Sequence, residues 1–254
     1  MLPRTATGWL RCRTPRTRPR ARLVCFPHAG GSASFFGNWP DHLPADVEAH
    51  AVQYPGREDR IAEEPPAGLD ALAGCVAREL AALLDRPIAL FGHSMGAVAA
   101  YEVARILEQH HGVTPLRLFV SGRHVPGEHR GDEIHRRDDA GLVAELVRVG
   151  GAGADVLAAS PELWPVFLPA IRDDYRLEET YRHRPGAPLR APVTALVGED
   201  DQEVTPDEAG RWSHYTSGPF ALHVMPGDHF FPAQHTTALL DLMLRELDAQ
   251  EAPR

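Results

Sequence analysis

The fold is decided by residues 87–96, Pro-Ile-Ala-Leu-Phe-Gly-His-Ser-Met-Gly, in which an apolar run leads directly into a Gly-x-Ser-x-Gly pattern. The residues that follow, 97–104, are mostly good helix formers. This order predicts a strand, a tight turn and a helix, with Ser94 at the tip of the turn. Gly92 and Gly96 are needed because the helix packs close to the strand, where larger side chains would collide.

The predicted turn presents two groups with chemical consequences. It exposes the Ser94 hydroxyl, a candidate nucleophile, and it places the backbone N–H of Met95 at a helix N-terminus, where a developing oxyanion is stabilised. A serine hydroxyl is a poor nucleophile at neutral pH, so it needs a histidine base. That base in turn needs an acid to hold its tautomer.

Length and composition favour one domain over residues 1–254, because a chain with 43% hydrophobic residues can bury a full α/β core. No apolar segment approaches the roughly 20 residues that span a bilayer, so we expect a soluble, cytoplasmic protein without membrane contact. Cys12, Cys25 and Cys75 have no metal-type spacing, which predicts neither a metal site nor a disulfide framework. The net charge of −9 argues against general nucleic-acid binding.

The start of the chain is rich in arginine and contains no acidic residue among residues 1–22. We expect this segment to be solvated and partly frayed, with docking to an acidic partner as the alternative. Its arginines are Arg4, Arg11, Arg13, Arg16, Arg18, Arg20 and Arg22.

Apolar β-type runs alternate with helical segments along the chain, which predicts a mostly parallel sheet flanked by helices on both faces. Residues 69–84 form one such helix, with leucines and a valine repeating on one face. The predicted strands are Leu23–Phe26, Val47–Gln53, Ile88–Phe91, Leu116–Ser121, Val193–Val197 and Phe220–Met225.

The alternation stops between residues 123 and 190, where the sequence becomes helical and charged. An insertion of this kind fits a helical lid over the carboxyl ends of the strands, where open α/β sheets bind ligands. Its apolar residues either line an acyl channel or pack the lid onto the body. They are Leu142, Leu146, Leu157, Leu163, Trp164, Phe167, Leu168 and Ile171.

The acid and the base are expected after the last two strands, in the chain order Ser, Asp or Glu, His. The run 193–197 leads into a loop containing Asp200 and Asp201, and the pattern Gly-x-x-Asp-x-x-Val selects Asp201, with Asp200 as a solvent-facing or loop-capping neighbour. His229 follows the last strand in a tight turn and is the candidate base. The other histidines considered are expected to be structural or exposed, or to point away from Ser94: His93, His214, His223 and His235.

A second oxyanion donor is expected after the first predicted strand. Residues 27–33, Pro-His-Ala-Gly-Gly-Ser-Ala, contain the glycines that allow close backbone approach, and the Ala29 amide is the candidate donor beside that of Met95. Together these residues predict a covalent acyl-Ser94 intermediate and require no cofactor.

Five segments together resemble the type II thioesterases, the stand-alone editing enzymes of polyketide and nonribosomal peptide synthesis, which have the α/β-hydrolase fold. The most specific is Pro-Gly-Arg-x-x-Arg at residues 55–60. The others are residues 27–33, 92–96 and 121–123, and Gly-Asp-His-Phe-Phe at 227–231.

The resemblance implies hydrolysis of an acyl thioester on the phosphopantetheine arm of an acyl-carrier or peptidyl-carrier protein. The resemblance implies that the catalytic triad is Ser94, Asp201 and His229. It also implies that the backbone amides of Ala29 and Met95 are the oxyanion donors. We expect a monomer. Arginines such as Arg57, Arg60 or those of the lid either steer acidic carriers or are solvated or helix-pairing charges. The alternatives are a general carboxylesterase or lipase with the same triad, a catalytically silent binding module, and a terminal domain of a larger synthase.

Overall fold

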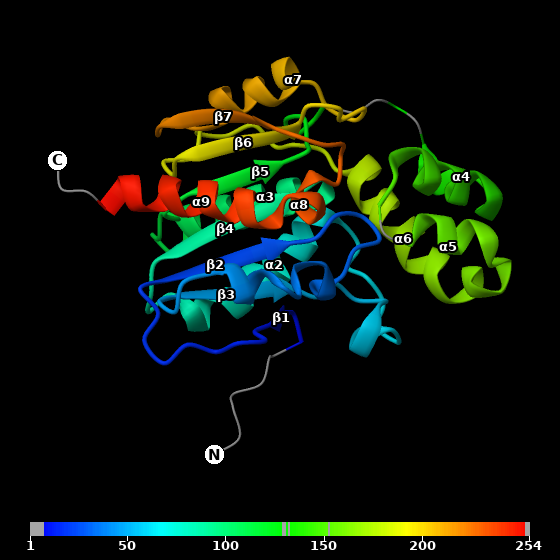
Figure 1. Ribbon diagram of the computed structural model, residues 1–254, viewed down its shortest axis with the longest axis horizontal. Helices are drawn as coiled ribbons and strands as arrows, with labels where there is room; N and C mark the ends of the chain where they lie inside the picture. The colour runs from blue at the N-terminus through cyan, green and yellow to red at the C-terminus, as the bar shows by residue number, and fades with distance from the viewer. Residues whose placement is uncertain (1–7, 129–130, 132, 152, 252–254) are drawn as a thin grey trace.

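The computed structural model describes residues 8–128, 131, 133–151 and 153–251. Its sheet has the strand order β1-β3-β2-β4-β5-β6-β7 (Figure 1). Strand β1 pairs with β3 in the antiparallel direction, and the other neighbouring strands pair in parallel. The strands are β1 Leu10–Arg11, β2 Ala21–Phe26, β3 Val47–Val52, β4 Ile88–His93, β5 Leu118–Ser121, β6 Val193–Gly198 and β7 Phe220–Met225. The predicted, mostly parallel sheet is therefore confirmed, with one additional edge strand.

Helices cover both faces of the sheet because the central strands are apolar on both sides. Helices α2 (Leu69–Leu80) and α3 (Met95–His110) pack on one face, together with side chains such as Val24 and Leu90. On the other face, Leu23 and Phe91 pack with α1 (Trp39–His42) and α9 (Thr236–Glu251). Alternate residues of one strand thus enter different cores, which fixes the register of the sheet.

The N-terminal arm departs from the prediction of a frayed segment. The backbone N–H groups of Trp9 and Leu10 donate to the Glu79 carboxylate at 3.0 and 3.1 Å, and β1 pairs with β3 as the edge strand of the sheet. Several arginines of the arm form ion pairs within the chain: Arg11 with Asp59, Arg20 with Asp46 and Asp248, and Arg22 with Glu48 and Asp85. Arg4 lies outside the described residues. Acids distant in sequence therefore fix this basic arm.

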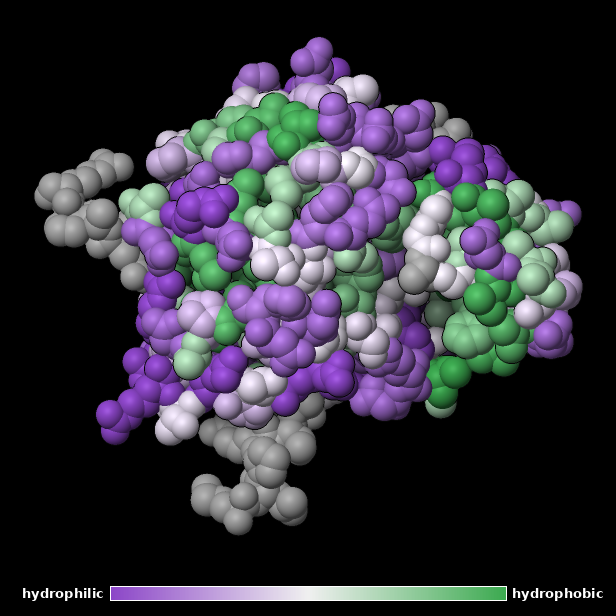
Figure 2. All heavy atoms as spheres, in the orientation of Figure 1, coloured by the Kyte–Doolittle hydropathy of each residue, from purple (hydrophilic) through white to green (hydrophobic). Residues whose placement is uncertain are grey.

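Three helices between β5 and β6 form a separate layer at the carboxyl ends of the strands, which we call the lid (Figure 1). They are α4 (Asp139–Val149), α5 (Ala154–Ala159) and α6 (Trp164–Thr180). The lid has a small apolar core of its own, made by Ile134, Leu142, Val143, Leu168 and Ile171. On the face drawn in Figure 2, apolar side chains also gather on the surface of the lid. Val156 of α5 and Phe167 of α6 are exposed.

The remaining α-helices are short, and they lie in the segments that follow β6 and β7. They are α7 (Pro206–Gly210), which begins with a capping box between Thr205 and Glu208, and α8 (Phe231–Gln234). In the described part of the chain, every helix falls short of the length and apolarity that crossing a bilayer requires.

Candidate active site

Ser94 lies at the sharp turn between β4 and α3. Its backbone has φ 54° and ψ −122°, a conformation that L-residues rarely adopt, and its N–H donates to the Ser121 carbonyl at 2.8 Å. A Cβ on Gly96 would lie 2.2 Å from the Phe26 carbonyl oxygen, and one on Gly92 would lie 2.1 Å from the Gly96 carbonyl oxygen. The chain can turn so tightly here because both positions are glycine.

The loops after β6 and β7 bring Asp201 to His229. Nδ1 of His229 lies 2.9 Å from Asp201 Oδ2 and 3.1 Å from Oδ1, and both residues are buried. Asp201 Oδ1 also accepts the backbone N–H of Glu203 at 2.7 Å, which orients the carboxylate. The neighbouring Asp200 is exposed, and its N–H donates to Gly227 at 3.0 Å. The structure thus places Asp201 against the imidazole and directs Asp200 to the surface.

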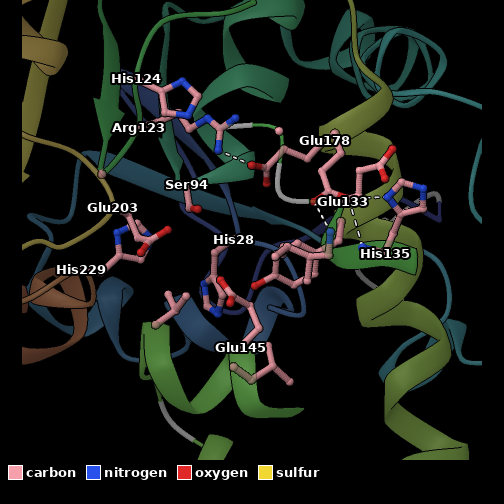
Figure 3. A pocket seen from close by; sticks show the side chains of 18 of the residues that line it. His28, Ser94, Arg123, His124, Glu133, His135, Glu145, Glu178, Glu203 and His229 are labelled. Atoms are coloured by element: carbon pink, nitrogen blue, oxygen red, sulfur yellow. Dashed lines mark hydrogen bonds and ion pairs between the residues drawn. The ribbon is translucent and has the colours of Figure 1, made fainter. Parts of the chain in front are cut away.

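Ser94 and His229 line the same pocket, which has a volume of about 350 Å³ and lies beneath the lid (Figure 3). The contacts described by the structure include no hydrogen bond between these two side chains. Such bonds are often long in a free enzyme and tighten when substrate binds.

The two candidate oxyanion donors lie beside Ser94. Met95 is the first residue of α3, and the first N–H groups of a helix have no partner within it. Ala29 lines the pocket from the loop after β2. Within that loop, the Gly31 N–H donates to the His28 carbonyl at 2.9 Å, and the Gly30 N–H donates to Asp174 of α6 at 2.7 Å.

Two further histidines pack close to His229. The His93 ring lies 4.9 Å from the His229 ring and 5.8 Å from the His28 ring, centroid to centroid. His93 is fully buried, and its Nδ1 lies 3.1 Å from Ser121 Oγ. Burial lowers the pKa of His28 to about 3 and that of His93 well below its usual value, with the neighbouring His229 adding to both shifts. Both rings are therefore neutral near pH 7.

The wall of the pocket opposite His229 carries many charged residues. Arg123, from the loop after β5, pairs with Glu178 of α6, and His135, from the 3-10 turn Ile134–Arg136, pairs with Glu179 of the same helix (Figure 3). Of the eight apolar lid residues considered as a channel, Leu146 lines this pocket. Leu142, Leu168 and Ile171 instead form the lid core, and Phe167 is 48% exposed. Of the two alternatives, packing therefore describes the three side chains of the lid core, since the lid helices must first bury their own apolar faces.

Arg57 and Arg60 are not placed to attract a carrier protein. Arg57 makes a two-pronged ion pair with Asp174, at 2.8 and 2.9 Å, and its side chain is 10% exposed. Arg60 is 5% exposed, donates to the Gln53 carbonyl at 2.7 Å and stacks on the Trp9 ring at 4.3 Å. The alternative in which they steer a partner is therefore wrong, because both guanidinium groups bind within the fold.

A cluster of metal-ligand types lies away from the pocket, where Cys12, Glu48 and His50 have ligand atoms within 4.8 Å of one another. The Glu48 carboxylate already binds the Arg16 N–H at 2.7 Å, Arg22 at 3.0 Å and His50 at 2.8 Å. Burial, with the Glu48 charge, raises the pKa of Cys12 to about 11. These contacts make the cluster a polar network that fastens the N-terminal arm.

Sequence reasoning did not assign a role to Asp174. This carboxylate is 1% exposed and lies on the buried face of α6, at the same three-residue spacing as Leu168, Ile171 and Leu177. A charge on the apolar face of a helix is a signal that the sequence does contain. Its partners, Arg57 and the Gly30 N–H, are 117 and 144 positions away and could not be identified from that signal.

Comparisons with known proteins agree with this geometry. A family model described as "Thioesterase domain" matches residues 21–247. The chain is 45% identical over 235 residues to a "Probable cadicidin biosynthesis thioesterase" of Streptomyces griseus, covering 92% of this chain and 64% of that protein. It is also 45% identical to "Thioesterase PikA5" of Streptomyces venezuelae, over 88% of this chain and 79% of the relative.

Solved structures include the type II thioesterase BorB from the borrelidin biosynthetic cluster. It superimposes with a TM-score of 0.88 and 42% identity, covering 96% of this chain and 99% of the BorB chain. The chain therefore belongs to the thioesterase family, among the type II thioesterases, and has their α/β-hydrolase fold.

Proposed function

We propose that this enzyme hydrolyses acyl thioesters held on the phosphopantetheine arm of acyl-carrier or peptidyl-carrier proteins, and that it removes unwanted acyl groups from a polyketide or nonribosomal peptide synthase. The relatives named for cadicidin and borrelidin biosynthesis support this assignment over a general esterase. We place the enzyme in the cytoplasm as a monomer, where such synthases would meet it.

The proposed chemistry follows from three side chains and two amides. His229 takes the hydroxyl proton of Ser94 as the oxygen attacks the thioester carbonyl, and Asp201 stabilises the imidazolium that forms. The oxyanion of the tetrahedral intermediate accepts hydrogen bonds from the Met95 and Ala29 amides. The carbon–sulfur bond then breaks, and the thiolate receives the proton from His229.

Deacylation repeats these steps with water. His229 removes a proton from a water molecule, whose oxygen attacks the acyl-Ser94 carbonyl. When the second tetrahedral intermediate collapses, the proton returns to Ser94 and the free acid leaves. No cofactor takes part in either half of the proposed reaction.

The single observation that carries the proposal is the buried Asp201–His229 pair, with its 2.9 Å contact, in the same pocket as the strained Ser94. A buried carboxylate on Nδ1 leaves Nε2 as the nitrogen that can accept a proton, which is the tautomer that a general base needs. The pocket volume of about 350 Å³ suits a short acyl group together with the end of the arm.

We propose that Arg136, in the 3-10 turn Ile134–Arg136 before the lid helices, contacts an acidic carrier in place of Arg57 and Arg60. Arg136 lines the pocket, and its side chain is 66% exposed, although it pairs with the exposed Glu133. An exposed ion pair of this kind contributes little to stability, so Arg136 can exchange its partner when a carrier approaches.

The test is intact-mass measurement of an acetyl- or propionyl-phosphopantetheinyl carrier protein, incubated with the wild type or with Ser94→Ala. We expect the wild type to remove the acyl group faster than it cleaves a simple oxygen ester. We expect Ser94→Ala to be slower by at least about 10³-fold, since the nucleophile is absent. Cleavage of the oxygen ester alone would instead identify a general esterase with the same triad.

A further inference from the structure

The loop that carries the Ala29 amide is a tight turn of a defined type. The Gly31 N–H donates to the His28 carbonyl at 2.9 Å, and Gly30, the third residue of the turn, has φ +78°. This hydrogen bond and this dihedral angle are those of a type II turn, which needs glycine at that position.

The turn determines where the Ala29 amide points. In a trans peptide the carbonyl and the following N–H lie in one plane and point in opposite directions. The direction of the His28 carbonyl therefore determines the direction of the Ala29 N–H. Because the carbonyl points toward Gly31 inside the turn, the Ala29 N–H points out of it. The turn must hold its form for this N–H to meet an oxyanion in the pocket.

The central peptide of the turn joins Ala29 to Gly30, and it directly follows the peptide that carries the Ala29 N–H. The N–H of that peptide donates to Asp174 Oδ2 at 2.7 Å. A hydrogen bond to a carboxylate that is paired with a guanidinium group is among the strong ones in proteins. Asp174 therefore anchors the turn to α6 at the peptide that adjoins the Ala29 amide.

Arg57 connects the same carboxylate to the other end of the turn. Its two terminal nitrogens lie 2.8 and 2.9 Å from the Asp174 oxygens, and one of them donates to the Gly31 carbonyl at 3.1 Å. The second also donates to the Ala170 carbonyl of α6 at 3.3 Å. The helix is packed tightly here, since a Cβ on Gly30 would lie 3.1 Å from the Ile171 side chain.

We propose that Asp174 of the lid helix is a positioning residue for the oxyanion hole, holding the 28–31 turn in the form that aims the Ala29 amide at the reacting carbonyl. Docking of α6 on the body and assembly of the oxyanion hole then depend on one carboxylate. The inference rests on the proposed role of Ala29 and adds a function for the lid beyond covering the pocket.

The decisive variant is Asp174→Asn, which keeps the volume but removes the charge that holds both Arg57 and Gly30. Its matched control is Asp173→Asn, because Asp173 is the adjacent acid of α6, and its side chain, 35% exposed, is paired with Arg176. Both changes remove one negative charge from the same helix. A small substrate, acetyl-N-acetylcysteamine, keeps carrier docking out of the measurement.

We expect Asp174→Asn to lower kcat by roughly 10- to 100-fold, with KM changed by less than about threefold, because a misplaced donor weakens the transition state more than the ground state. A short-chain trifluoromethyl ketone, which forms a tetrahedral adduct with Ser94, should bind more weakly by a similar factor. Asp173→Asn should stay within about twofold of the wild type in both measurements.

A merely structural role for Asp174 would lower the melting temperature and leave kcat and ketone affinity of the folded enzyme unchanged, and this result would overturn the inference. Should Asp174→Asn fail to fold, hydrogen exchange in the wild type still tests it. We expect the Gly30 amide to exchange as slowly as the amides in the middle of α6, and rapid exchange would contradict the inference.

Failure of the proposed function is a separate outcome. A wild type that neither cleaves the thioester nor forms an adduct with the ketone would refute the function itself. A wild type that does both, with an Asp174→Asn variant that equals it, would refute the inference about Asp174 alone.

Discussion

The two adjacent aspartates after β6 differ in environment although both belong to the same short loop. Asp201 is 9% exposed, and its carboxylate contacts the His229 ring and two backbone N–H groups. Asp200 lies at the surface. Neighbouring side chains of a tight loop point in different directions. For this reason Asp201 is the buried partner of His229, whereas Asp200, one position earlier, is solvated.

Exchange of each aspartate for asparagine tests this difference. We expect Asp201→Asn to lower kcat by roughly 10³- to 10⁴-fold, because an amide can stabilise the wrong tautomer of His229 and carries no charge for the imidazolium. Asp200→Asn removes the same charge one residue away and should stay within about twofold. Steady-state kinetics on acetyl-N-acetylcysteamine measures both, and equal losses in the two variants would contradict the assignment of Asp201.

At the scale of single elements, α3 shows how a strand and a helix come together around one turn. Gly96 in its first turn lies against the backbone of β2 and of the loop after it, and the helix is buried along most of its length. The strained Ser94 conformation persists because this packing over-determines it. The helix thus both builds the core and fixes the Met95 amide.

Two glycine-to-alanine changes in neighbouring helices should have opposite effects on stability. A Cβ on Gly96 would lie 2.2 and 2.6 Å from two backbone carbonyl oxygens, so Gly96→Ala should lower the free energy of unfolding by about 3 kcal/mol or more. A Cβ on Gly74 of α2 meets no atom within 4 Å among the described residues. Gly74→Ala should therefore raise the free energy of unfolding by about 0.5–1 kcal/mol, since alanine has the higher helix propensity.

Urea unfolding monitored by circular dichroism measures both glycine variants. A Gly96→Ala protein as stable as the wild type would show that the elbow is looser than its geometry implies. A Gly74→Ala protein that loses stability would show that α2 packs differently on this side.

At the scale of the whole molecule, stability depends on pH through histidines buried beside the active site. His28 and His93 are neutral in the fold because burial lowers their pKa values, that of His28 from 6.5 to about 3. In the unfolded chain both rings bind protons near pH 6.5. Acidification between these values therefore favours the unfolded state, and stability rises as pH rises through the same window.

We expect the free energy of unfolding to fall by about 2 kcal/mol between pH 7 and pH 5 through His28, with a further loss of the same sign through His93. Urea titrations at the two pH values measure this loss. The Cε1 proton resonances of His28 and His93 should stay at their neutral positions down to pH 5, which separates these groups from acids that titrate nearby. Movement of either resonance above pH 5 would contradict the prediction.

Local sequence could predict the elbow and the strand and helix pattern, because each depends on neighbouring residues. The run 220–225 is a strand with the predicted bounds, and the helix predicted over 69–84 is α2 followed by a 3-10 turn at Ala81–Leu83. Strand β1 escaped prediction because it has two residues and pairs only with a strand formed 40 residues later. Its placement depends on the hydrogen bond from the Trp9 N–H to the Glu79 carboxylate, and no local sequence pattern shows that these two residues are neighbours.

By itself the sequence determined the parallel sheet, the turn at Ser94 and the family to which the chain belongs, since periodicity, glycine spacing and short motifs are properties of adjacent residues. The tertiary structure decided which partners the charged residues find. The basic arm binds acids along the chain, and Arg57 meets Asp174 of the lid. The physical reason is that an ion pair or a buried hydrogen bond joins groups distant in sequence, and only the folded backbone sets the distance between them.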